Sequence, residues 1–293
     1  CQPSGASGHN FLFIQTSLDN NDTLHYQINS TSTSRTGGIS NANGYVYYEN
    51  SNMKEVSISQ GKNSVMFIKN STIQANDYSW HNAVISSKGK IFINDATLQG
   101  TSSLTFIGSA DTIFIDETNN GQTKIDAIIG SKRNTLNETQ YSRVVVNNAS
   151  FIREITTMAD VYNGNINLLC PSPFVRDSQT HADINVFGGK IGQITNVAHT
   201  SGNNTLCNNR NLHIYGGTIG GGKEWTKTGI HLGYTYYFEV PQTGTLLNDT
   251  LNLYGGKIQV PKDYSLINFT DNTVINVYHK DNPSKRTQFQ FHP

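Results

Sequence analysis

The side chains in this sequence that are best suited to bind a ligand are aromatic and lie in segments that interrupt a repeated motif. Flat rings on a polar surface stack against the faces of sugars, and loops carry binding residues more often than the scaffold beneath them. We therefore predict a glycan-binding site, with the alternative that some of these rings form one inward-facing row of a strand. The predicted ligand-binding residues are Trp80, Trp225, Tyr234, Tyr236 and Tyr237.

Acid–base catalysis would need carboxylates that converge in space. The nearest candidates in sequence are Asp111 with Asp116 and Glu117, and Glu224 near His231. The chain has no CxxC, no HExxH and no histidine or cysteine cluster at zinc spacing. We therefore predict no catalytic residue, no metal and no cofactor. Carboxylates from successive strands can still meet, so a polysaccharide lyase or glycoside hydrolase remains an alternative.

The charge balance excludes a strongly basic or acidic protein. Lys and Arg together number 21, Asp and Glu together also number 21, and charged residues make up 14% of the 293 residues. This composition predicts no nucleic-acid partner. No apolar run reaches the roughly 18 residues that span a bilayer, so we expect membrane contact only through an anchor.

The three cysteines suggest an exported protein. Cys1 is followed by a flexible, uncharged stretch, residues 2–8, and this arrangement resembles the start of a mature bacterial lipoprotein. The resemblance implies lipidation at Cys1 and a location at the cell surface or outer membrane, unless Cys1 is only a processing boundary. Cys170 and Cys207 then remain as a candidate disulfide pair, with two separate thiols as the alternative.

The elements that must position these side chains are predicted by an eight-residue motif. It reads apolar, any, apolar, any, Asn/Asp/Gly, Ser/Ala/Gly, any, apolar. The alternation has the period of a strand with one buried face, and the two small residues suit a sharp bend. The motif therefore predicts a strand, a corner and a new strand. Six copies begin at residues 66, 91, 144, 184, 212 and 251.

The return of this corner along the chain predicts an all-β fold made of stacked coils. The pattern resembles the right-handed single-stranded parallel β-helix superfamily, which includes pectate-lyase-like enzymes, phage tailspikes and adhesins. We expect a flexible tether over residues 1–10, an N-terminal cap and loop over 11–50, and roughly eight or nine coils with a C-terminal cap over 51–293. The corner residues expected to stack as equivalent bends are Asn70, Asp95, Asn148, Gly188, Gly216 and Gly255.

The hydrolase motifs of that superfamily, an Asn-Thr-Asp strand, an Asp-Asp pair and a Gly-His-Gly, have no counterpart here. We therefore expect a non-catalytic, exported cell-surface protein with an adhesive or structural role and glycan contact, whose partners are glycans or surface proteins. One alternative is a glycan-binding lipoprotein of a carbohydrate uptake system. Assembly into a larger complex through the ends of the fold is a further expectation.

Overall fold

The computed structural model confirms that the chain is all-β. It describes residues 10–29, 34–75, 83–100, 106–109, 111–130, 143–169, 182–194, 210–220, 228–231, 249–259, 265–268 and 273–290, and these contain strands, turns and bends but no helix. Within these ranges, accordingly, no helix is long and apolar enough to cross a membrane. The chain divides into two compact units: unit 1 comprises residues 1–142 and 148–151, and unit 2 comprises residues 143–147 and 152–293.

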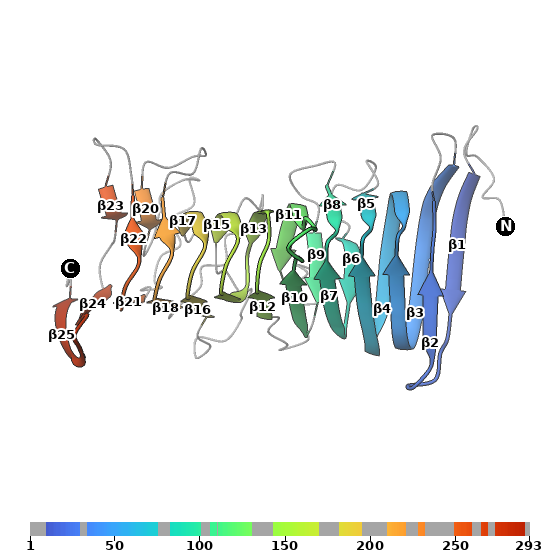
Figure 1. Cartoon of the computed structure of the whole chain (residues 1–293). Coiled ribbons are helices and arrows are strands. Elements are labelled where there is room, and N and C mark those ends of the chain that lie inside the picture. The colour runs from blue at the N-terminus through green and yellow to red at the C-terminus, as the bar shows by residue number, and fades with distance from the viewer. Residues whose placement is uncertain are drawn as a thin grey trace, which may run out of the picture. The chain divides into compact units, whose positions relative to one another are not determined.

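Unit 1 is built from parallel strands that pair residue over residue (Figure 1). One row of strands contains β2, the end of β3, the end of β4, β7 and β10. A second row contains β5, β8 and β11, and a third contains β1, the start of β3, the middle of β4, β6 and β9. The strands are β1 (Asn10–Thr16), β2 (Thr23–Tyr26), β3 (Ser34–Glu49), β4 (Asn52–Lys69), β5 (Thr72–Ala75), β6 (Ala83–Ser87), β7 (Lys90–Asn94), β8 (Thr97–Gln99), β9 (Phe106–Ser109), β10 (Thr112–Asp116) and β11 (Lys124–Gly130).

Unit 2 repeats this plan. Its first row of parallel strands runs β12, β14, β16, β18, β21 and β24, and a second runs β13, β15, β17, β19 and β22. The strands are β12 (Arg143–Val146), β13 (Phe151–Ile155, whose first residue belongs to unit 1), β14 (Met158–Val161), β15 (Asn165–Leu169), β16 (Ala182–Val186), β17 (Lys190–Ile194), β18 (Arg210–Ile214), β19 (Thr218–Ile219), β20 (Thr228–His231), β21 (Thr250–Leu253), β22 (Lys257–Ile258), β23 (Ser265–Asn268), β24 (Val274–His279) and β25 (Asn282–Gln290).

The apolar positions of the motif form the core, as the alternation predicts. In β7, Ile91 and Ile93 are buried while Phe92 between them is only half-buried. β10 repeats the pattern with Ile113 and Ile115. Branched aliphatic side chains suit this setting because they pack well on a pleated surface. These two strands therefore bury one row of side chains and turn the other away from the core.

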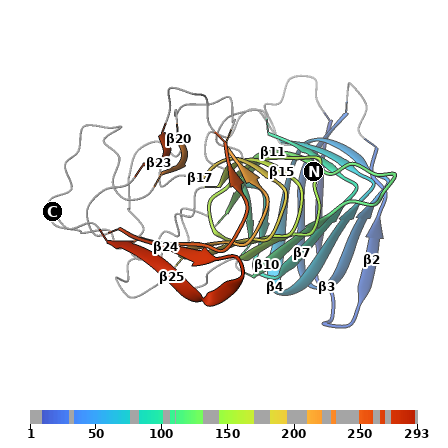
Figure 2. The ribbon, with the colours of Figure 1, turned by 60° about the vertical axis from the view of Figure 1, so that its left-hand side comes forward.

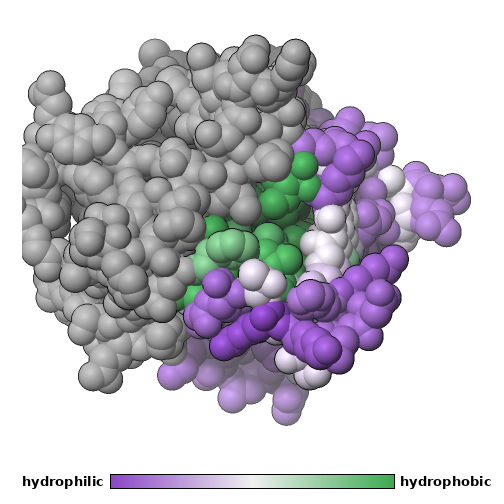
Figure 3. All heavy atoms as spheres, turned by 90° about the vertical axis from the view of Figure 1, so that its left-hand side faces the viewer, coloured by the Kyte–Doolittle hydropathy of each residue, from purple (hydrophilic) through white to green (hydrophobic). Residues whose placement is uncertain are grey.

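The C-terminal end of unit 2 differs from the rest because β25 pairs antiparallel with β24 (Figure 2). Ile275 and Val277 of β24 continue the inward rows of β21, and Phe289 lies opposite Ile275. Val277 is 38% exposed and Phe289 is 48% exposed. In the view onto this end, apolar side chains lie at the centre, with hydrophilic ones beside and below them (Figure 3).

The corners do not all bend in the same way, which corrects the expectation of equivalent bends. In the copies near the N-terminus the left-handed residue is the first of the two corner residues, as at Asn70 (φ 48°) and Asp95 (φ 50°). In the late copies it is the second, as at Gly217 (φ 84°) and Gly256 (φ 87°). The change from Asn to Gly along the chain therefore accompanies a shift of the bend by one position.

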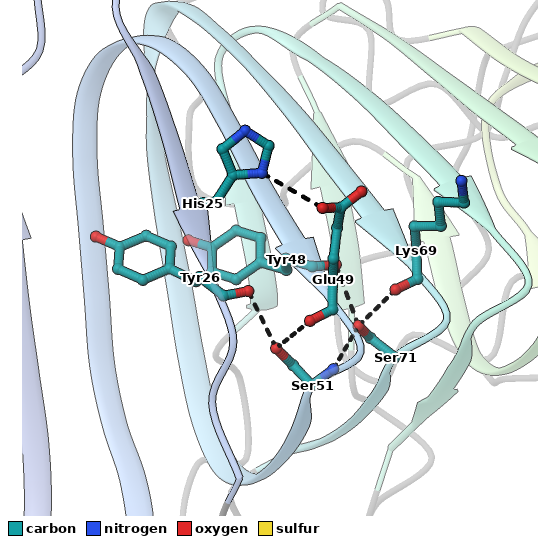
Figure 4. Close-up of polar contacts among 7 residues, drawn as sticks. All are labelled: His25, Tyr26, Tyr48, Glu49, Ser51, Lys69 and Ser71. Atoms are coloured by element: carbon teal, nitrogen blue, oxygen red, sulfur yellow. Dashed lines mark hydrogen bonds and ion pairs between the residues drawn. The ribbon is translucent and has the colours of Figure 1, made fainter.

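A serine closes the bend after β3, at Asn50–Ser51, and the bend after β4, at Asn70–Ser71 (Figure 4). The Ser51 backbone N–H donates to Ser71 Oγ (3.1 Å), and Ser71 Oγ donates to the carbonyl of Lys69 (2.8 Å). Ser51 Oγ accepts from the backbone N–H of Ile28 (3.0 Å). These hydroxyls satisfy backbone groups that the bend removes from strand pairing, which would be costly to leave unpaired where they are buried.

The core of unit 1 also holds a polar cluster. Tyr48 is fully buried, stacks on Tyr26 with ring centroids 5.2 Å apart, and accepts a hydrogen bond from Asn41 Nδ2 (3.0 Å). Tyr26 and Thr16 both donate to Asn41 Oδ1. Burial raises the pKa of Tyr48. The hydroxyl of this large side chain is accommodated because Asn41 supplies a partner inside the core.

Candidate functional site: two aromatic ladders

A row of stacked rings lies on the outside of unit 1 and is called the unit 1 ladder here. Successive ring centroids are 4.6, 4.4, 4.9 and 4.7 Å apart, and the ring planes lie within 12° of parallel. The strand register places each ring directly over the next. The members of the unit 1 ladder are His25, Tyr47, Phe67, Phe92 and Phe114.

A second row lies on unit 2 and is called the unit 2 ladder. Its centroids are 4.8, 4.9, 4.6 and 4.1 Å apart, and its planes lie within 18° of parallel. Three of its rings are exposed, Tyr162 by 51%, Phe187 by 41% and Tyr215 by 43%, whereas Tyr254 and Tyr278 are half-buried. The members of the unit 2 ladder are Tyr162, Phe187, Tyr215, Tyr254 and Tyr278.

The spacing of the ladders determines what they can bind. Adjacent strands lie about 4.8 Å apart, so stacked rings on neighbouring strands cover one another's faces. A sugar binds an aromatic side chain through the ring face, and only an end ring of a ladder has a face that no other ladder ring covers. The interior rings of a ladder instead offer their edges and, for tyrosine, a hydroxyl. The ladders therefore suit a partner that contacts ring edges along a line.

The polar side chains beside the unit 2 ladder form a further row on the same strands. Asp160, Asn185, His213, Asn252 and Asn276 face one another in register across β14, β16, β18, β21 and β24. Asn185 Nδ2 donates to Asp160 Oδ1 (2.7 Å), and Asn276 Nδ2 donates to Asn252 Oδ1 (2.8 Å). Arg143 forms an ion pair with Asp160. Asparagine side chains therefore form hydrogen bonds across neighbouring strands at this position, where Asn252 and Asn276 are buried.

The C-terminal end of the unit 2 ladder is electrostatically distinct. The hydrogen bond from Arg286 to the Tyr278 hydroxyl, reinforced by one from Tyr254, lowers the pKa of Tyr278. Desolvation, and next the hydrogen bond to Tyr278, raises the pKa of Tyr254 to about 12. Arg286 can act here because β25 places it opposite Tyr278. The Tyr254 hydroxyl thus donates to the Tyr278 hydroxyl, and Tyr278 is the stronger acid of the two.

Replacing Arg286 by Met should raise the pKa of Tyr278, because the strongest donor to its phenolate is removed. The measurement is the ultraviolet absorbance of tyrosinate against pH, in which the earliest part of the transition should move to higher pH. The lowered pKa of Tyr278 stabilises the folded state only at pH values above that pKa, where the phenol is ionised. At neutral pH the free energy of unfolding of the variant should therefore equal that of the parent chain. Lys285→Met is the control. An unchanged titration of Arg286→Met would contradict the assigned contact.

Three of the carboxylates considered for catalysis, Asp111, Asp116 and Glu117, form local hydrogen bonds, whereas Glu224 lies outside the described residues. Glu117 Oε2 accepts from the Thr123 N–H (2.9 Å) and from the Ser150 N–H and Oγ (2.7 and 2.8 Å), and Glu117 Oε1 accepts from Asn148 Nδ2 (3.0 Å). Asp116 Oδ1 accepts from the Glu117 N–H (2.9 Å), and Asp111 Oδ1 from the neighbouring backbone N–H (2.6 Å). The described part of the chain contains no group of three metal-ligating side chains.

The residues predicted from sequence to bind glycan lie outside the described residues: Trp80, Trp225, Tyr234, Tyr236 and Tyr237. The same holds for the predicted lipidation and disulfide residues Cys1, Cys170 and Cys207. Three further tyrosines that are close in sequence point to different places from strand β3: Tyr45 is exposed, Tyr47 belongs to the unit 1 ladder, and Tyr48 lies in the core.

The ladders were not predicted, although the motif contains their signal. In five of its six copies, one of the two unrestricted strand positions is Phe or Tyr: the second position is Phe67 and Phe92, and the fourth is Phe187, Tyr215 and Tyr254. Neighbouring strands align equivalent motif positions, so a ring that recurs at one position must stack. Val46–Met53 is also a copy of the motif, with Tyr48 in place of an aliphatic residue and Asn50 (φ 49°) at the bend.

Comparison with known proteins identified no relative whose function could be compared with that of this chain. No family model, no curated protein and no solved structure matches the chain.

Proposed function

We propose that this chain is a non-catalytic, exported surface protein with an adhesive or structural role, built as a right-handed parallel β-helix of the pectate-lyase-like and adhesin-like kind, and that it contacts glycans. The fold part of the proposal rests on register. Within each unit, parallel strands stack row upon row, and a corner with a left-handed residue follows strands of one row, as at Asn70 in unit 1 and Gly217 in unit 2. One coil per repeat explains both features.

The observation that carries the non-catalytic role is the bonding of Glu117. A general acid or nucleophile needs a carboxyl group free to exchange protons or attack a substrate. The Glu117 side chain accepts four hydrogen bonds, two of them from backbone N–H groups. A carboxylate held in this way suits a structural role. A rigid stack of strands with rows of outward side chains is suited to presenting surfaces.

The glycan part of the proposal rests on the aromatic segments at Trp80 and at 225–238, because the interior ladder rings do not offer their faces. A glycan array probed with the purified chain tests this part. We expect saturable binding to a restricted set of glycans, lost in Trp225→Ala and retained in Phe92→Ala, which alters the unit 1 ladder. Absence of binding to any glycan would reject glycan contact.

The same bound glycans should be recovered intact after prolonged incubation with the protein. Chromatography of the glycans, with detection of new reducing ends and of unsaturated products, separates a binder from a hydrolase or a lyase. Cleavage at a rate that depends on protein concentration would overturn the non-catalytic role, and the alternative of a polysaccharide-degrading enzyme would replace it.

A further inference from the structure

The two ladders differ in the charges beside them. In the unit 1 ladder each of four rings has a charged residue two positions away on its own strand: Glu49 beside Tyr47, Lys69 beside Phe67, Lys90 beside Phe92, and Asp116 beside Phe114. In the unit 2 ladder the three central rings, Phe187, Tyr215 and Tyr254, have no Asp, Glu, Lys or Arg within two positions on either side. The centre of the unit 2 ladder is therefore an uncharged aromatic ridge, whereas its two end rings lie beside charged residues, Tyr162 near Asp160 and Tyr278 opposite Arg286.

The residues on both sides of this ridge are small or uncharged, so a partner molecule can come close to the rings. On one side each central ring is followed by two glycines, as at Gly188–Gly189 and Gly216–Gly217, and on the other lies the polar row that includes Asn185 and His213. Enrichment in Tyr and Phe with depletion of charge marks the buried centre of a protein interface. Contiguous exposed aromatic surface on a soluble protein has the same meaning.

The spacing of the rings indicates the kind of partner. A partner that fills the notches between all five ring edges must carry side chains at the same 4.1–4.9 Å interval over the same length. That interval is the spacing of paired β-strands, so stacked strands can match it rung by rung. A glycan would need ring faces, which the stack covers. The chain itself carries the matching surface, namely the same ladder on another copy.

We infer that two copies of this chain associate side by side through the unit 2 ladder. The contact is isologous: a two-fold axis passes near the middle of the ladder, so that the ring edges of one copy lie between those of the other. Closed two-fold dimers are the commonest soluble assemblies, and a row of evenly spaced rings whose three central members are uncharged is self-complementary under such an axis. The contact is lateral and is distinct from assembly through the ends of the fold.

Analytical ultracentrifugation of the full chain tests the inference, with Phe187→Lys as the interface variant. Each copy would bring a lysine to a desolvated aromatic contact, so dimerisation should weaken at least about tenfold. Phe92→Lys is the matched control, because Phe92 is likewise an interior ring, with neighbours at 4.9 and 4.7 Å. It should dimerise as the parent chain does. Circular dichroism checks that both variants fold.

Three outcomes would overturn the inference: a parent chain that stays monomeric up to about 0.1 mM, a Phe187→Lys variant that dimerises normally, or equal weakening by the two substitutions. Salt supplies a second criterion. Raising salt from about 0.1 M to about 1 M shortens the Debye length from ~10 Å to ~3 Å, and an uncharged aromatic contact should not weaken. Dissociation at high salt would instead indicate a charge-driven contact elsewhere.

A third measurement needs no variant and remains informative if Phe187→Lys fails to fold. Brief exposure to a photogenerated one-electron oxidant joins two neighbouring phenols by a carbon–carbon bond, with loss of one hydrogen atom from each. The covalent dimer should contain dityrosine formed from Tyr162, Tyr215, Tyr254 or Tyr278. Peptide mapping that places the cross-link only at Tyr45 or Tyr47 would contradict the inference.

Discussion

Gly216→Ala should lower the free energy of unfolding by about 3 kcal/mol, the upper part of the range for overpacking a close-packed site. A Cβ built on Gly216 would lie 2.4 Å from the carbonyl oxygen of Phe187 in the neighbouring strand layer. That oxygen belongs to the backbone, so it cannot move aside as a flexible side chain would. The Gly216 N–H also donates to the Val186 carbonyl (3.2 Å), which holds the two layers together. Chemical denaturation followed by circular dichroism measures the loss.

The control for this prediction uses the other kind of corner. Asn70→Gly keeps a residue that tolerates a positive φ, so the change in stability should stay within about 1 kcal/mol. Gly217→Asn should still destabilise, although Asn tolerates the conformation, because its Cβ would lie 2.9 Å from the Gly188 backbone. If Gly216→Ala and Asn70→Gly cost the same, the corners are interchangeable and the structural distinction between them is wrong.

The rows of the core could be predicted from sequence because they depend on local alternation. Ile91 and Ile93 are buried as the motif predicts. The same prediction applies wherever two apolar residues are separated by a single residue of any type. The motif copy at Val46–Met53 was missed because Tyr48 is large and polar-tipped. Its burial depends on Asn41, a partner whose position the motif does not specify. A local pattern cannot report such a partner.

The shift of the bend could not be predicted either. Asn, Asp, Ser and Gly all suit a corner, so composition does not say which of two adjacent residues takes the left-handed conformation. The reason lies in packing: a Cβ on the first glycine, Gly216, would meet the Phe187 carbonyl, and the second, Gly217, then makes the bend. The ladders, by contrast, were predictable in principle, because they need only the register that the motif itself defines.

The role of Glu117 could not be predicted from sequence, because its hydrogen-bond partners are far from it in the chain. Two of its partners, Asn148 and Ser150, lie 31 and 33 residues further along the chain. From sequence, Glu117 is simply one of three neighbouring carboxylates, and a catalytic cluster is one interpretation. The structure shows that Glu117 connects segments that are distant in the chain, which its place in the sequence does not reveal.

Glu117→Ala should lower the free energy of unfolding of unit 1 by about 3 kcal/mol, because two backbone N–H groups lose a charged acceptor. Thr123, one of the donors, is fully buried, so water cannot simply replace the carboxylate. Glu117→Gln should cost less, since it keeps one carbonyl oxygen for these donors. Denaturant unfolding monitored by circular dichroism measures both variants.

Glu49→Ala is the matched control, because Glu49 is a carboxylate of the same unit whose side chain contacts the exposed His25 (3.3 Å). Removing such a surface pair should change stability by no more than about 0.5 kcal/mol. A loss in Glu117→Ala no greater than that of Glu49→Ala would show that Glu117 is not needed for the fold. A structural role would then no longer explain why this carboxylate is present, and the catalytic interpretation would regain its strongest candidate.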